Sequence, residues 1–147
     1  MANYPKRATG ADGTEFRSGF ESKVADELLK HSVDFSFEEH QLQFKKKVIK
    51  SSCDNCGSKE VYQHRTYTPD FYLPELGFFI ETKGRFVSKD RTKMLAVIKC
   101  NPDLDIRMYF QQDNKLTKGK DDKYSDWCIK HGVTYCIGSI PEEWLNG

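Results

Sequence analysis

Three charged side chains, apart from Glu75 in a predicted turn, lie inside a mostly apolar and aromatic stretch of the chain, residues 67–84. They are Asp70, Glu81 and Lys83, and charge is uncommon inside β-strands, the structure that such a stretch favours. Two carboxylates and an ammonium group suit a hard divalent cation that binds a phosphate. Such a cation lowers the pKa of a bound water, and a nearby lysine positions that water or offsets developing charge. The trio therefore predicts hydrolysis of a phosphodiester, with Mg²⁺ or Mn²⁺ as cofactor.

Two strands joined by a turn are expected to position this trio. The turn signal Pro-Glu-Leu-Gly separates candidate strands at 66–73 and 78–83. Side chains alternate along a strand, so Glu81 and Lys83 share one face, and antiparallel pairing brings Asp70 alongside them. The structural alternative is a Glu81–Lys83 ion pair on a sheet with no chemical role.

A fourth candidate, Glu21, lies in the segment 14–33, which has helical periodicity. The apolar stripe of that helix is formed by Phe16, Phe20, Val24 and Leu28, widened by Ala25 and Leu29. Glu21 falls at the edge of the stripe, where a glutamate is unfavourable unless it is paired or bound to a metal. The functional interpretation makes Glu21 a third metal ligand. The alternative is a side chain that extends into solvent at the rim.

Several stretches of the chain together resemble one family of nucleases. They are 16–24 (FRSGFESKV), 67–71 (YTPDF), 81–84 (ETKG), 103–107 (DLDIR) and 140–144 (IPEEW). They are similar to the bacteriophage endonuclease I family, four-way (Holliday) junction resolvases of T-odd phages in the PD-(D/E)xK superfamily. The resemblance extends from about residue 16 to 144. It implies that Glu21, Asp70, Glu81 and Lys83 are catalytic, and that the three carboxylates bind the metal.

The resemblance also implies a fold and an assembly. The expected fold is α/β, a restriction-endonuclease-like mixed β-sheet flanked by helices, in a strand-swapped, intertwined homodimer. Glu21 of one chain would then complete the site of the other. The segment 35–50 reads as one long strand, whose phase slips near Glu38 and Glu39. At about 3.3 Å per residue it would reach roughly 50 Å, whereas a compact domain of this size is about 40 Å across. The strand must therefore break or leave the domain, and the resemblance makes it a bridge between the two sites.

Further elements are expected beyond the site. They are a helix at 91–100 capped by Ser88, a strand at 105–111, a helix at 125–131, a strand at 133–137 and a short helical turn opened by Pro141.

Length and composition predict a single nuclease domain at 14–147 after a flexible N-terminal segment, 1–13. No apolar run is long enough to span a membrane, and the N-terminus has no secretory h-region, so we expect the protein in the cytoplasm. No Gly-rich phosphate loop or Ser-His-Asp set is present. We expect no small-molecule substrate and no membrane partner.

A cysteine pair, Cys53 and Cys56, interrupts the resemblance at 51–65. Two cysteines at this spacing followed by glycine are typical of a zinc knuckle. The pair is half of a tetrahedral site, so His64 or the same pair of a second chain would supply further ligands. The alternative is two reduced thiols without a metal. The remaining cysteines, Cys100, Cys128 and Cys136, are expected to be buried.

Basic residues gather in the sequence although the net charge is only +1. The predicted DNA-binding residues are Arg17, Lys45, Lys46, Lys47, Arg85, Lys89, Arg91 and Lys93. Beside a phosphodiesterase site such residues bind backbone phosphates; elsewhere they usually form a solvated face.

Three functions are compatible with these features. The first is a metal-dependent endonuclease that acts as a homodimer on branched DNA junctions. The second is a nuclease of the same fold with a sequence-specific or nicking activity. The third is a zinc-stabilised nucleic-acid-binding module without catalysis.

Overall fold

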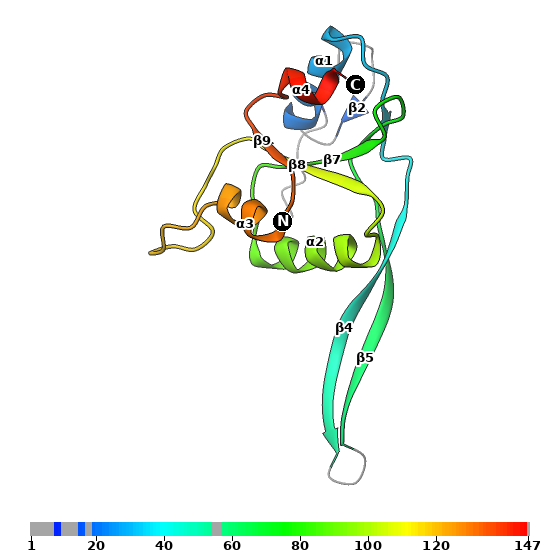
Figure 1. The fold of residues 1–147 in the computed structure, drawn as a ribbon, viewed down its shortest axis with the longest axis vertical. Coiled ribbons are helices and arrows are strands. Elements are labelled where there is room, and N and C mark those ends of the chain that lie inside the picture. Colours follow the sequence, from blue (N-terminus) through cyan, green and yellow to red (C-terminus); the bar gives the residue numbers. More distant parts are fainter. Residues whose placement is uncertain (1–7, 10–14, 17–18, 54–56, 147) are drawn as a thin grey trace.

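The computed structural model describes residues 8–9, 15–16, 19–53 and 57–146. Its body is a five-stranded mixed sheet in the order β3-β6-β7-β8-β9 (Figure 1). The antiparallel part is formed by β3 (Ser36–Phe37), β6 (Phe71–Leu73) and β7 (Phe78–Lys83). From β7 the sheet continues in parallel to β8 (Asp105–Phe110) and β9 (Tyr135–Ile137).

Helices cover both faces of this sheet. Helix α2 (Ser88–Cys100) connects β7 to β8, and α3 (Tyr124–His131) precedes β9. Their buried side chains share one hydrophobic cluster with one face of the sheet. Helices α1 (Gly19–Lys30) and α4 (Glu142–Leu145) pack on the other face in a second cluster. The fold is therefore mixed α/β with a central sheet flanked by helices, as the sequence predicts.

Burial on both faces explains the sequence of β7. Its first five residues, Phe78 to Thr82, are all buried. A strand covered on both sides reads as a continuous apolar run, and in this run Glu81 is the exception. A carboxylate at such a place is costly unless it is hydrogen-bonded or bound to a cation.

Two helix boundaries differ from those predicted. Helix α1 occupies residues 19–30 rather than 14–33. Glu15–Phe16 form β2 (Glu15–Phe16), which pairs with β1 (Ala8–Thr9), so strand pairing overrides the helical periodicity there. At the other end Ser32 has a φ of 55°, a left-handed conformation that ends the helix.

Helix α2 begins at Ser88 itself, with Val87 as the N-cap and no side-chain cap. The predicted cap at Ser88 is therefore wrong by one residue. The remaining predicted helix, strands and terminal turn agree with α3, β8, β9 and α4 within two residues.

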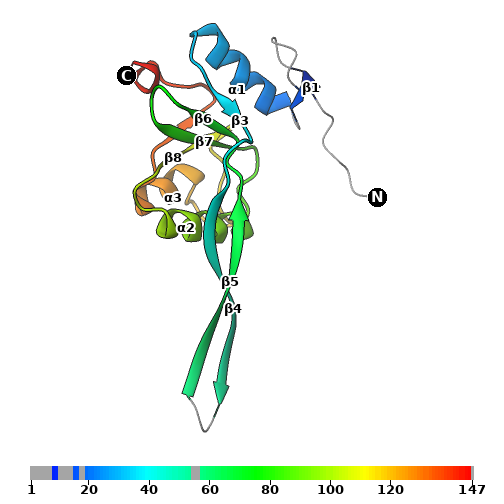
Figure 2. The ribbon, with the colours of Figure 1, turned by 90° about the vertical axis from the view of Figure 1, so that its right-hand side faces the viewer.

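The predicted long strand at 35–50 breaks. It begins as β3, and the backbone then turns at Glu38, whose φ is 54°. The chain resumes as β4 (Leu42–Cys53), which pairs with β5 (Gly57–Tyr67) in a long antiparallel hairpin. This hairpin, called the arm below, projects beyond the body of the molecule (Figures 1 and 2).

Three other predictions concern particular residues of the structure. Most of the predicted knuckle insertion, 51–65, is paired strand in the arm. Of the predicted flexible segment 1–13, only Ala8–Thr9 are described, and these form β1. Cys100 is exposed rather than buried because it is the last residue of α2, whereas Cys128 and Cys136 are buried as expected.

Candidate active site

The four predicted residues line one cavity of about 710 Å³ beside the edge of β7. Glu21 comes from α1, Asp70 from the residue before β6, and Glu81 and Lys83 from β7. The cavity wall also contains Glu38, Tyr67, Thr82 and Lys93. The structure therefore brings all four predicted side chains together from three separate parts of the sequence.

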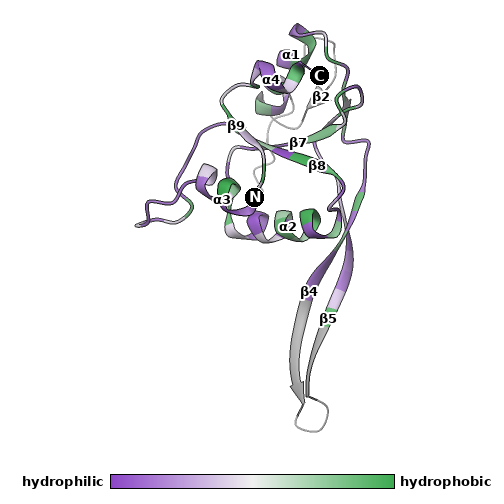
Figure 3. Ribbon diagram, in the orientation of Figure 1, coloured by the Kyte–Doolittle hydropathy of each residue, from purple (hydrophilic) through white to green (hydrophobic). Residues whose placement is uncertain are grey.

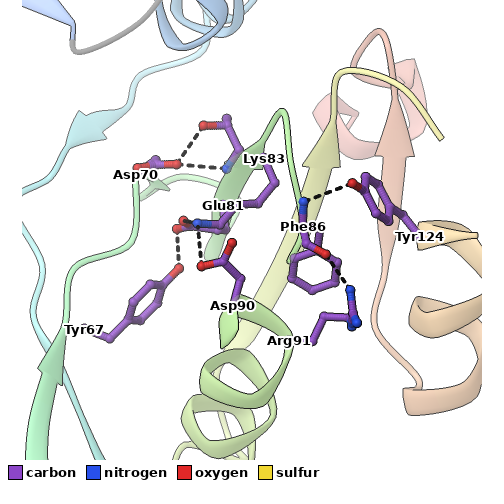
Figure 4. Close-up of polar contacts among 9 residues, drawn as sticks. Tyr67, Asp70, Glu81, Lys83, Phe86, Asp90, Arg91 and Tyr124 are labelled. Atoms are coloured by element: carbon purple, nitrogen blue, oxygen red, sulfur yellow. Dashed lines mark hydrogen bonds and ion pairs between the residues drawn. The ribbon is translucent and has the colours of Figure 1, made fainter. Parts of the chain in front are cut away.

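Asp70 is oriented by Thr82. The backbone N–H of Thr82 donates to Oδ2 of Asp70 at 2.9 Å, and the Thr82 hydroxyl donates to the same oxygen at 2.7 Å (Figure 4). The Asp70 carbonyl accepts a hydrogen bond from the backbone of Glu38 at 2.9 Å. Two donors on one carboxylate oxygen stabilise the ionised form and fix its direction. Sequence reasoning missed Thr82 because alternation placed it on the face opposite Glu81.

Glu81 is 5% exposed and lies between a phenol and an amine. The Tyr67 hydroxyl donates to its Oε2, and Nζ of Lys83 lies 3.6 Å from its Oε1. Burial, the largest cause, and the nearby charge of Asp70 together raise the pKa of Glu81 from 4.5 to about 8, against the opposing effects of Lys83, Tyr67 and Lys93. At neutral pH, without a cation, this carboxyl therefore holds a proton.

Tyr67 was not among the predicted site residues. It ends β5, is buried, and has a pKa well above its ordinary value because of burial and the charge of Glu81. The phenol therefore stays a neutral donor to Glu81. The sequence signal was available, since Tyr67 stands three residues before Asp70 in the apolar stretch.

Lys83 lies at the mouth of the cavity between two acids. Its ammonium is 3.6 Å from Glu81 and 3.8 Å from Oδ1 of Asp90, in the first turn of α2. About a quarter of its side chain is exposed. The two acids hold the amine beside the carboxylates, where it remains accessible to an incoming phosphate.

Glu38, a third residue that the sequence did not predict for the site, joins Glu21 and Asp70. One carboxylate oxygen from each of the three lies within 4.8 Å of the others. Oε2 of Glu21 and Oε1 of Glu38 are both shielded from solvent. The slip in strand phase at Glu38 was a signal, but it indicated only a bend, whereas the bend also turns this carboxylate toward the site.

The donor set of the cavity fits a hard divalent cation. Glu21, Glu38, Asp70 and Glu81 offer only oxygen ligands, which Mg²⁺ and Mn²⁺ prefer over soft metals. Ionised carboxylates this close together repel one another, and a cation removes that repulsion. The site therefore has both the ligands and the electrostatic need for such an ion.

Comparison with known proteins bears directly on this site. The whole chain, residues 1–147, matches the family described as Phage endonuclease I. The chain belongs to this family. Endonuclease I of Escherichia phage T7 is 38% identical over 147 residues, which cover 99% of this chain and 88% of the relative. Endodeoxyribonuclease 1 of Enterobacteria phage T3 is 39% identical over 139 residues, which cover 94% of this chain and 80% of the relative.

The predicted DNA-binding residues of this phage endonuclease I family member fall into three groups. Lys93 lines the cavity, with its ammonium 5.1 Å from the centre of the Tyr67 ring. Arg91 donates to the Phe86 carbonyl at 2.7 Å, so it anchors the loop before α2. Exposed side chains form the third group, which consists of Lys45, Lys46 and Lys47 on the arm, Arg85 before α2 and Lys89 in the first turn of α2. Arg17 lies outside the described residues, and DNA contact stays a prediction for the whole set.

The zinc prediction for this family member also stays open. Cys53 is the last residue of β4 and is paired with Gly57, whereas Cys56 lies outside the described residues. His64, the suggested further ligand, is exposed in β5 opposite Lys45.

Within the described residues, no helix is both long and apolar enough to cross a bilayer.

Proposed function

We propose that this protein is a divalent-metal-dependent DNA endonuclease that cleaves phosphodiester bonds in four-way and other branched junctions. The observation that carries the proposal is the cavity in which Glu21, Asp70, Glu81 and Lys83 meet. Oxygen-only ligands beside an accessible lysine suit phosphodiester hydrolysis. Two relatives that cover nearly all of the chain are named as endonucleases.

Each residue of the cavity has a separate role in the proposed reaction. Glu21, Asp70 and Glu81, with Glu38, would hold the metal, Mg²⁺ or Mn²⁺. When bound, the metal supplies a water of lowered pKa and neutralises charge on the phosphoryl oxygens. Thr82 holds Asp70 in position and Tyr67 holds Glu81. Lys83 places a positive charge where the phosphate becomes more negative, which lowers the energy of the transition state.

We also propose that the protein works as a homodimer, because symmetric cuts across a two-fold junction need two linked sites. Glu21 and Glu38 precede the arm in sequence, and Asp70, Glu81 and Lys83 follow it. A dimer in which β4 of one chain pairs with β5 of the other would keep the same pairing register and the same donor set. The chain connectivity thus supports the intertwined arrangement that the family resemblance implies.

The first test is cleavage of matched DNA substrates. Purified protein with Mg²⁺ or Mn²⁺ should cut a four-way junction with immobile arms and spare a plain duplex and single strands of the same sequence. Lys83→Ala should reduce the cleavage rate by at least about 10²-fold, the usual scale for loss of an electrostatic donor, and should leave junction binding in place. The matched control is Lys99→Ala, an exposed lysine in the last turn of α2.

Two outcomes would contradict this proposal. If the folded protein with Mn²⁺ leaves every branched and linear DNA intact, it is not a nuclease. If Lys83→Ala and Lys99→Ala cleave equally well, the cavity is not the active site. Equal cutting of junction and duplex would instead favour a same-fold nuclease with another target.

A further inference from the structure

One face of the arm continues outward from the wall of the active-site cavity. Thr66, in β5, lines the cavity, and Gln43 lies directly opposite it in β4. The Gln43 amide donates to the Thr66 hydroxyl at 3.3 Å, so the two side chains lie on the same face. This face is called the outer arm face below.

Alternation assigns the next residues to the outer arm face. Opposed residues of an antiparallel pair share a face, and so do residues two apart. Lys45 opposite His64 follows first, and Lys47 opposite Tyr62 follows next. All four side chains are exposed.

The other face of the arm is directed at the body. Leu42 and Phe44 are buried in the hydrophobic cluster that includes α2. Asn101, which follows α2, donates from Nδ2 to the Gln43 carbonyl at 2.9 Å. The root of the arm is therefore fixed against α2, which gives the outer arm face a set direction from the cavity.

The arm near the body is positively charged. Residues 42–47 and 61–67 contain Lys45, Lys46, Lys47 and Arg65 and no aspartate or glutamate. Figure 3 shows hydrophilic residues along this part of β4. A basic ribbon with an exposed tyrosine suits a nucleic-acid backbone more than an acidic or apolar protein surface. A second copy of the same face would be repelled by its like charge.

We propose that the outer arm face binds the DNA duplex next to the phosphate that is cleaved, with Lys45 and Lys47 contacting its backbone. This inference rests on the proposed function. The two lysines are about 6.6 Å apart along the strand, and a two-stranded ribbon fits the major groove of B-DNA. The length of β4 is roughly 36 Å, which is about one helical turn of duplex.

The test compares two double variants that lose the same charge. Lys45→Ala with Lys47→Ala removes both lysines of the outer arm face. The control, Lys99→Ala with Lys130→Ala, removes two exposed lysines that lie in α2 and α3 rather than on the arm. Junction affinity is measured from about 50 to 200 mM salt with Lys83→Ala present in all proteins, so that the DNA stays intact.

The outer-face variant should bind about 10-fold to 100-fold more weakly near 100 mM salt. Its slope of log affinity against log salt should decrease by about 2 relative to the protein with both lysines, because two phosphate contacts are lost. Hydroxyl-radical footprinting should show lost protection of the flanking duplex, within about ten base pairs of the cleaved phosphate. The control should keep the slope and the footprint.

Equal slopes and footprints for the two double variants would overturn the arm proposal. Lys45→Arg with Lys47→Arg, which keeps the charge, should restore the slope and so exclude misfolding as the cause. The two proposals fail separately. A protein that cuts junctions but shows no effect of the arm variants contradicts only this inference, whereas a protein that neither binds nor cuts DNA contradicts the proposed function itself.

Discussion

At the scale of single residues, the site is a set of acids held in different states by their neighbours. Asp70 receives two hydrogen bonds from Thr82, which favour its ionised form. Glu81 is buried, and its pKa is raised to about 8. The buried acid is poised to exchange its proton for a cation, so metal binding should release protons and strengthen as the pH rises toward about 8.

The raised pKa of Glu81 makes a prediction about stability. Between pH 4.5 and about 8 the folded state holds a proton that the unfolded state has released, so the free energy of unfolding should fall as the pH rises through this window. Glutamine does not titrate, so the Glu81→Gln variant should not show this fall in the free energy of unfolding. Without metal, the free energy of unfolding of the variant minus that of wild type should increase by about 2–4 kcal/mol between pH 5 and pH 9.

Urea denaturation at several pH values measures this difference directly. Mg²⁺ added at pH 8 should stabilise wild type more than the variant, because the variant lacks one of the carboxylates that would bind the ion in the folded state. Parallel pH curves for the two proteins would show that Glu81 is not the titrating group.

At the scale of elements, the turn between β3 and β4 does more than connect two strands. It places the Glu38 carboxylate beside those of Glu21 and Asp70, and it redirects the chain into the arm. A φ of 54° is uncommon for a residue other than glycine or asparagine, and such conformations gather at functional sites.

Glu38→Gln should therefore weaken metal binding about tenfold with little change in fold. The amide keeps the size of the side chain but removes the charge that holds a divalent cation. Titration of Mn²⁺ by calorimetry measures the affinity. Glu39→Gln, an exposed neighbour in the same turn, is the control, and equal affinities for the two variants would remove Glu38 from the ligand set.

The elements also show how far the sequence predicts this fold. Strand β7, helix α3 and the parallel strands follow from local patterns, because apolar periodicity and Gly132 at the end of α3 determine them. The site acids were recognisable as charges in an apolar setting. Tyr67, Thr82 and Glu38 were not predicted as site residues, because their roles depend on contacts between segments. The position of Tyr67 and the phase slip at Glu38 were signals, but neither indicated those contacts. The break of the predicted long strand likewise depends on a turn conformation at one residue.

At the scale of the whole molecule, the arm is the connection between two halves of the site. Residues 19–41 carry Glu21 and Glu38, and residues from 67 onward carry the other acids and Lys83. One chain contains the full set, and two chains that exchange their first halves would contain it twice.

Subunit mixing tests this exchange. Glu21→Ala and Asp70→Ala proteins should each be inactive alone. If the halves are exchanged between chains, one site of the mixed dimer carries both substitutions and the other carries neither. A mixture that has exchanged subunits should then recover cleavage, up to about a quarter of the wild-type sites if chains combine at random.

Activity of the mixture is measured on a four-way junction, and subunit exchange is verified by mass spectrometry of differently tagged chains. No recovery despite complete exchange would show that each site is built from one chain, because every site would then contain one of the two substitutions.

The division of the acids between the two halves has a mechanical consequence. A cation bound by Glu21 and Asp70 would also hold helix α1 against the sheet, because Glu21 lies in α1 and Asp70 directly precedes β6. At a concentration one hundred times its dissociation constant, such an ion adds about 2.7 kcal/mol to the folded state. The same ion would then act both in catalysis and as a structural link. Removing it with a chelator would loosen helix α1 and stop cleavage together.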